Sequence, residues 1–206
     1  MKKFLSGISL IIITAVLICS CSSGSKFAWT EDALSFKSDS ETVTLAANTH
    51  IEITEGSADV NTFGADTVSG YEGAFKTSAN IGIGDSVKDF IKAYGVKYDT
   101  AMWETYKAKD ETETIVNYTP YTNDMIDFKS FDDCFITVGF FDDEKGNWSA
   151  MTGEQLKAVW DLTAADTEYG DIAIISAGLD KSGNINEIIC DYGSYADFKT
   201  GEEKVG

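Results

Sequence analysis

The segment from Asn80 to Gly95 constrains the fold more tightly than any other part of the chain. Ser86 with Asp89 three residues later comes close to a capping box, which prefers Glu or Gln at the second position. Gly95 stands where a left-handed C-cap is favoured. We therefore predict a short strand that turns at Gly84 into a helix of about eight to ten residues. The apolar residues of this segment recur at the spacing of one helical face, and they are Val87, Phe90, Ile91 and Tyr94.

Other segments show the patterns of short strands and of a second helix. Alternation predicts strands around Val43–Leu45 and Ile51–Ile53, joined by a hairpin connection over residues 46–49. The small, polar residues 55–70 are typical of a surface loop. Thr152 and Gln155 form a capping box, which predicts a helix over residues 153–163. Further strands are expected at residues 114–118 and 134–141, and a hairpin at residues 172–179 and 185–192 around a turn at 180–184.

These elements predict the fold class. We expect an α+β domain in which short helices pack on one antiparallel sheet of four to six strands. The domain is expected to span residues 27–198, and the charged residues 199–206 are expected to form a frayed tail.

The charge of the chain limits its partners. All 16 basic residues are lysine, against 34 Asp and Glu, and the formal net charge is −18. A nucleic-acid-binding protein needs a basic surface to neutralise phosphates, so we expect no nucleic-acid partner. The 43% content of hydrophobic residues is too high for a disordered acidic tail.

The N-terminus has the layout of an export signal. Lys2 and Lys3 are followed by an apolar run from Ile8 to Cys19 and then by small residues. This run is shorter than the ~20 residues that a helix needs to cross a membrane. The sequence from Ile18 to Cys21 resembles the lipobox of bacterial lipoproteins, with an aliphatic residue at −3 and a small residue at −1. The resemblance implies cleavage after Ser20 and lipid attachment at Cys21.

A lipid on Cys21 implies where the protein is located. Residues 1–20 would be the signal peptide and residues 21–26 a lipidated tether. Two or three acyl chains anchor a protein stably to a membrane, whereas one is marginal. We therefore expect attachment through the N-terminal lipid to the outer face of the cytoplasmic membrane, or to the outer membrane where the cell has one.

The helical segment also resembles a family pattern. Small envelope lipoproteins of the β-lactamase-inhibitor-protein-like and outer-membrane-assembly groups have a Gly, a Ser or Thr, an aliphatic residue and a second Gly at the spacing of Gly84, Ser86, Phe90 and Gly95. Phe90 departs from the usual Val or Leu. The resemblance covers about 16 residues and implies helices packed on an antiparallel sheet that binds other proteins. It implies no individual binding residue.

Two cysteines remain in the body of the chain. Cys134 and Cys190 each lie on the same face of a predicted strand as apolar neighbours two residues away. They are interpreted either as two small buried hydrophobic residues or as a disulfide, which an exported protein permits. Neither has a histidine nearby in the sequence, so a catalytic thiol is not expected.

Residues that could support catalysis or metal binding are few. His50 is the only histidine and is interpreted as an ordinary histidine beside a strand. Gly82 and Gly84 lack the third glycine of a dinucleotide loop and are interpreted as the turn before the helix. Acidic runs occur at Asp132–Asp133, at residues 142–144 and at 180–184, and turn formation explains the later two better than a weak calcium site. No cofactor, metal site or catalytic residue is predicted.

The aromatic residues suggest a binding surface. Trp103 and Trp148 fall in segments that look like loops or turns, so we expect them to be the exposed candidates for contact with a partner. Trp160 lies on the stripe of the second helix and is expected in the core. The sequence thus predicts a non-enzymatic, lipid-anchored module that binds another envelope protein or a surface polymer. A calcium- or ligand-binding module and a carboxylate-dependent enzyme that acts on glycans are the alternatives.

Overall fold

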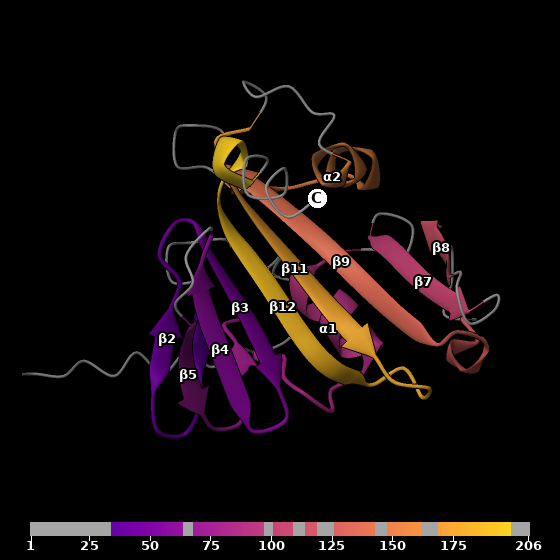
Figure 1. The fold of residues 1–206 in the computed structure, drawn as a ribbon, viewed down its shortest axis with the longest axis horizontal. Helices are drawn as coiled ribbons and strands as arrows, with labels where there is room; N and C mark the ends of the chain where they lie inside the picture. The colour runs from indigo at the N-terminus through magenta and orange to yellow at the C-terminus, as the bar shows by residue number, and fades with distance from the viewer. Residues whose placement is uncertain are drawn as a thin grey trace, which may run out of the picture.

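The computed structural model describes residues 34–63, 68–96, 101–108, 114–118, 126–142, 148–161 and 169–198. Strands dominate these residues, and the helices are short (Figure 1). The elements in chain order are β1 (Ser35–Lys37), β2 (Thr42–Thr44), β3 (Thr49–Thr54), β4 (Ser57–Thr62), β5 (Val68–Glu72), β6 (Lys76–Thr77), α1 (Val87–Tyr94), β7 (Met102–Ala108), β8 (Thr114–Tyr118), the 3₁₀ turn η2 (Phe128–Ser130), β9 (Asp133–Asp142), β10 (Trp148–Ala150), α2 (Gly153–Trp160), β11 (Asp171–Leu179) and β12 (Ile185–Ser194).

The strands form two antiparallel sheets. Nine strands build the main sheet in the order β5-β4-β3-β12-β11-β9-β7-β8, with β10 paired to β9. The three-stranded small sheet has the order β2-β1-β6. The predicted combination of short helices with an antiparallel sheet is confirmed in outline. The prediction of one sheet with four to six strands was wrong, because several strands lack the apolar alternation by which a half-buried strand is recognised.

The predicted loop over residues 55–70 accounts for two of the missing strands. It contains β4 and the start of β5, which pair with each other and join β3 to the edge of the sheet. Of the five residues in β5, four are exposed and one is half-buried. An edge strand that is solvated on both faces carries no hydrophobic pattern, so its composition resembles that of a loop.

The predicted hairpin over residues 46–49 was also wrong. β2 pairs with β1 in the small sheet, whereas β3 pairs with β4 and β12 in the main sheet. The chain passes from one sheet to the other at Asn48, which has a positive φ of 63°. Asn tolerates this left-handed conformation better than most residues. The strands themselves fall where the alternation of Val43, Leu45, Ile51 and Ile53 predicts them.

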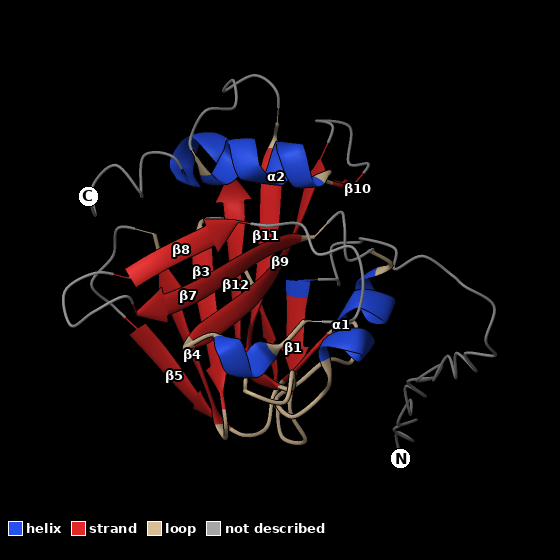
Figure 2. Cartoon of the chain, turned by 90° about the vertical axis from the view of Figure 1, so that its right-hand side faces the viewer, coloured by secondary structure: helices blue, strands red, loops and turns tan. Residues whose placement is uncertain are grey.

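The larger core lies on one face of the main sheet. The inward residues of β3, β9, β11 and β12 pack there against α1 and the small sheet, both of which lie on the same side of the main sheet (Figure 2). The helix is the one predicted: Ser86 and Asp89 form a capping box, and Gly95 has the left-handed φ of 65°. Its apolar stripe of Val87, Phe90, Ile91 and Tyr94 is buried. The strand expected before Gly84 is reduced to a single bridge between Lys76 and Gly82.

A smaller core lies on the opposite face of the main sheet. There α2, with Leu156 and Val159 buried, packs on Ile172 and Ile174 of β11. The predicted capping box of Thr152 and Gln155 is present, and the helix ends at Trp160, earlier than predicted. A helical turn over residues 195–198 closes this core. The two helices therefore cover opposite faces of the main sheet.

The remaining predicted strands are confirmed as β8, β9, β11 and β12. No helix among the described residues has the length and apolar character needed to cross a membrane.

Candidate functional site

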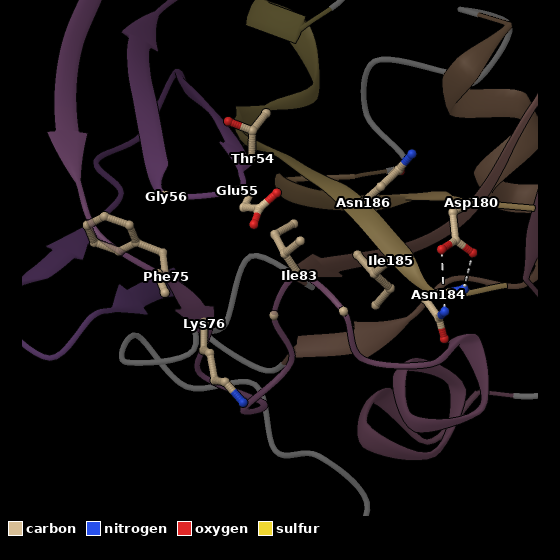
Figure 3. Close-up of a pocket in the computed structure, with 13 residues that line it drawn as sticks. Thr54, Glu55, Gly56, Phe75, Lys76, Ile83, Asp180, Asn184, Ile185 and Asn186 are labelled. Atoms are coloured by element: carbon tan, nitrogen blue, oxygen red, sulfur yellow. Dashed lines mark hydrogen bonds between the residues drawn. The ribbon is translucent and has the colours of Figure 1, made fainter. Parts of the chain in front are cut away.

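A pocket lies where four turns and strand ends of the fold meet (Figure 3). It has a volume of about 550 Å³, within the range of small-molecule sites. The β3–β4 turn, the segment that enters β6, the turn before α1 and the β11–β12 turn each contribute to it. The lining residues are Thr54, Glu55, Gly56, Ala74, Phe75, Lys76, Gly82, Ile83, Gly84, Asp180, Asn184, Ile185 and Asn186.

Backbone hydrogen bonds join the turn before α1 to the β11–β12 turn. The Gly84 amide donates to the Ile185 carbonyl at 2.7 Å, and the Ile185 amide donates to the Asp85 carbonyl at 2.8 Å. The Val87 amide donates to the Gly183 carbonyl at 3.0 Å. Gly84 has a φ of 88°, which a residue with a side chain rarely adopts. The two turns thus form one connected wall of the pocket.

The opposite wall is held in a similar way. The Gly73 amide donates to the Gly56 carbonyl at 2.8 Å, which ties the segment before β6 to the β3–β4 turn. Gly56 has a φ of 85° in this tight turn between paired strands. Backbone hydrogen bonds of the fold itself therefore hold both walls, and binding would cost little conformational entropy.

The base of the pocket is apolar. Phe75 and Ile185 are each 2% exposed and belong to the larger core, and the half-buried Ile83 packs against that core. In Figure 3 Ile83 lies between Glu55 and Lys76. Polar and charged groups around an apolar base are typical of small-molecule sites.

Two charged side chains of opposite sign line the pocket. The Glu55 carboxylate has no hydrogen-bond or ion-pair partner among the residues described. The Lys76 ammonium lies 3.8 Å from the Asp85 carboxylate, and its side chain is 49% exposed. Gly82 makes room for the stem of Lys76, because a Cβ at this position would lie 2.9 Å from Lys76 Cγ. A side chain at position 82 would therefore displace the Lys76 side chain from its present position.

The Asp180 carboxylate is used by its own turn. Its Oδ1 accepts hydrogen bonds from the backbone amides of Ser182 at 2.7 Å and Asn184 at 2.9 Å. These bonds lower the pKa of Asp180, the bond from Asn184 most of all. The turn explanation of this acidic run thus agrees with the geometry. Among the residues described, no three Asp, Glu, His or Cys side chains gather as metal ligands.

A second polar area lies on the face of the main sheet that carries α2, on β3 and β12. His50 Nδ1 lies 2.8 Å from Asp191 Oδ1, across the β3–β12 pairing. The hydrogen bond to Asp191 raises the pKa of His50, against the opposing effect of burial. Burial and a hydrogen bond with Glu52 raise the pKa of Glu187.

Buried polar side chains on β7, β9 and β11 extend this area. Glu104 is 4% exposed and accepts a hydrogen bond from the Tyr106 hydroxyl at 2.7 Å. Burial raises the pKa of Glu104. The hydroxyl oxygens of Thr137 and Ser176 lie 2.8 Å apart between neighbouring strands. These groups are paired within the fold, so they serve its packing.

The two tryptophans predicted as binding residues are not where the sequence analysis placed them. Trp103 lies in β7 and is fully buried in the larger core, so the prediction of an exposed residue was wrong. Trp148 begins β10 and is half-buried, and its ring packs against Tyr192 at a centroid distance of 6.2 Å. Trp160, expected in the core, is half-buried and packs against the smaller core from the end of α2, so the expectation holds in part. Tryptophans near turn residues can belong to strands, and composition alone does not distinguish the two.

The two cysteines are separate buried thiols. Both are free. Cys190 pairs with Ile175, which pairs with Val138, so Cys134 lies four residues further along β9 and two strands away. That offset is about 13 Å along the strands and about 10 Å across them. A disulfide needs Cα atoms closer than about 7 Å, so the geometry agrees with the buried-hydrophobic alternative.

Cys21 and the signal peptide lie outside the described residues. No family model, curated protein or solved structure matches the chain. Lipid attachment and the resemblance to small envelope lipoproteins therefore stay predictions.

Sequence reasoning missed the pocket residues Glu55, Lys76 and Asn186. Glu55 precedes β4 and Lys76 lies in the two-residue β6, and the sequence pattern hides both strands. Asn186 is an exposed polar position of the predicted strand β12, where nothing in the pattern marks it as a pocket residue. The turns at residues 82–84 and 180–184 were both recognised as turns, and each contributes to the pocket. Their contact with each other consists of backbone hydrogen bonds between residues far apart in the sequence, for which the local sequence gives no signal.

Proposed function

We propose that this chain is a non-enzymatic, lipid-anchored binding protein of the cell envelope, and that its partner enters the pocket around Glu55 and Lys76. The lipobox resemblance at Cys21 supports the anchor. The net charge of −18 supports a partner other than nucleic acid.

One observation carries the proposal. Four segments, at residues 54–56, 74–76, 82–84 and 180–186, build a pocket of about 550 Å³ whose walls are held by backbone hydrogen bonds. Charged and amide side chains surround its apolar base. A preformed pocket of this kind favours a small polar group of the partner, bound with little rearrangement of the protein.

Retention on envelope material tests the pocket. The full-length protein in detergent micelles is mixed with isolated cell-wall and membrane fractions from its own cells. We expect the double variant Glu55→Gln/Lys76→Met to be retained about tenfold less, because charge-assisted hydrogen bonds are lost.

The matched control is Glu72→Gln/Lys37→Met. Glu72 lies on β5, and Lys37 pairs with Lys76 across β1 and β6, yet neither lines the pocket. Both changes remove the same charges from exposed positions. Equal retention of the two double variants would contradict the proposal.

A second experiment tests the anchor. Metabolic labelling with a clickable fatty acid is expected to tag the wild-type protein and to miss the Cys21→Ser variant. The same label on both proteins would contradict lipid attachment at Cys21, and it would leave the pocket to be judged by the retention experiment.

A further inference from the structure

We infer that the ligand of the pocket is zwitterionic: a short peptide with a free ammonium group that binds Glu55 and a free carboxylate that binds Lys76. This inference rests on the proposed function, because it names the ligand class of the same pocket. It follows from the placement of two charges that make no strong interaction with each other or with the other described residues.

The two charges are not paired with each other. Glu55 follows β3 and Lys76 lies in β6, and no ion pair joins their side chains. The contact between Lys76 and Asp85 is 3.8 Å long and half-exposed, which makes it worth little in water. A ligand with both charges could therefore bind each group without breaking a strong interaction of the protein.

A polar group of the pocket lining fits a peptide bond. The Asn186 side chain lines the pocket and has no hydrogen bond to another described residue. Its amide can donate to a peptide carbonyl and accept from a peptide N–H. Asn184, in contrast, donates to Asp180 at 3.3 Å and is engaged within its turn.

The base of the pocket fits an apolar side chain. Ile83 lies between Glu55 and Lys76, and Phe75 and Ile185 line the pocket on either side of it (Figure 3). Burial of one aliphatic side chain there would add affinity in proportion to the area removed from water. A neutral sugar has no charge to satisfy Glu55 or Lys76, so the lining favours the zwitterion.

Calorimetric titration of the full-length protein with glycyl-leucine tests the ligand class. Two blocked forms are titrated beside it: N-acetyl-glycyl-leucine, which lacks the ammonium, and glycyl-leucine amide, which lacks the carboxylate. We expect each blocked form to bind about tenfold more weakly, because a charge-assisted hydrogen bond is lost.

Single variants assign each charge to its residue. Glu55→Gln should weaken the binding of glycyl-leucine about tenfold. It should leave the affinity for the acetylated form unchanged, because that form has no ammonium group to bind Glu55. Lys76→Met should weaken the binding of glycyl-leucine and leave the affinity for the amide form unchanged. Glu72→Gln and Lys37→Met are the controls and should bind like the wild type. Both tested positions are exposed, so the variants are expected to keep the wild-type melting temperature.

Other outcomes overturn the inference. Equal binding of all three peptides, or no binding of any, would contradict a zwitterionic ligand. Pocket-dependent binding of a neutral chito-oligosaccharide in their place would contradict it as well, while the proposed function would stand. Failure of the retention experiment with envelope fractions would overturn the proposed function and this inference together.

The source of the peptide is a separate arm of the same test. Isolated cell wall is compared before and after digestion to soluble peptides. Each preparation competes with glycyl-leucine for the pocket. Stronger competition by the soluble peptides supports a free peptide as the ligand, whereas stronger competition by the intact wall supports peptide ends held in a polymer. Competition by neither would contradict the inference.

Discussion

The Nδ1 atom of His50 on β3 lies 2.8 Å from Oδ1 of Asp191 on β12, and the two residues are direct partners in the antiparallel pairing. The hydrogen bond to Asp191 raises the pKa of His50 above its ordinary value near 6.5. The pair should therefore stabilise the fold fully below about pH 6.5, and its contribution should disappear as the pH rises through the folded-state pKa.

The first prediction concerns this pair. Because the chain has one histidine, its ring signals in an NMR titration report His50 alone. We expect Asp191→Asn to lower the pKa of His50, since the substitution removes the acceptor charge. The exposed Asp39→Asn serves as a control and should leave the titration unchanged. An unchanged titration in Asp191→Asn would contradict the pairing.

The second prediction concerns the N-terminus of α1. The Ser86 hydroxyl accepts a hydrogen bond from the Asp89 amide at 3.3 Å, and the Asp89 carboxylate bonds back to the Ser86 amide. Ser86→Ala should lower the free energy of unfolding by about 1 kcal/mol. Ser86→Asn keeps a capping oxygen and should retain most of that stability. Urea denaturation measures both, and equal losses would show that the cap is not the cause.

The third prediction separates the two tryptophans. Trp103 is fully buried, so Trp103→Ala should lower the free energy of unfolding by about 3–5 kcal/mol, or prevent folding. Trp103→Phe fills part of the space and should cost less. Trp148 is half-buried, and Trp148→Ala should cost less than Trp103→Ala. If Trp148→Ala lowered the free energy of unfolding as much as Trp103→Ala or more, the assignment of Trp103 as the core residue would be contradicted.

The fourth prediction concerns the thiols. Burial raises the pKa of Cys134 to about 12 and raises the pKa of Cys190 well above its ordinary range. Neither thiol should react with a maleimide in the folded protein at pH 7, because the thiolate is the reactive form. In denaturant without reductant both should react. Labelling that needs a reductant would indicate the disulfide instead.

The sequence predicted best those elements whose signals are local. The capping boxes at Ser86 and Thr152, the αL glycine at Gly95 and the hairpin around Asp180 each depend on a few adjacent residues, and all four are present. Local hydrogen bonding and helical periodicity are physical causes that a short sequence window contains.

The sequence predicted least well those elements that depend on distant pairing. β4 is a strand because β3 offers it an edge, and β5 is a strand because β4 does, although most of their own residues are polar. Trp103 is buried because β7 joins β9 at the far side of the sheet. The pocket residue Lys76 lines the same pocket as the β11–β12 turn, although the two are far apart in the sequence. Tertiary context decides each of these cases.

Hydrogen–deuterium exchange of the full-length protein, with and without the envelope fraction that retains it, tests most directly whether the pocket is the binding site. If the pocket is the binding site, we expect added protection in the four segments that line it, at residues 54–56, 74–76, 82–84 and 180–186. Protection centred on β3 and β12 around His50 and Asp191, or no added protection at all, would contradict it.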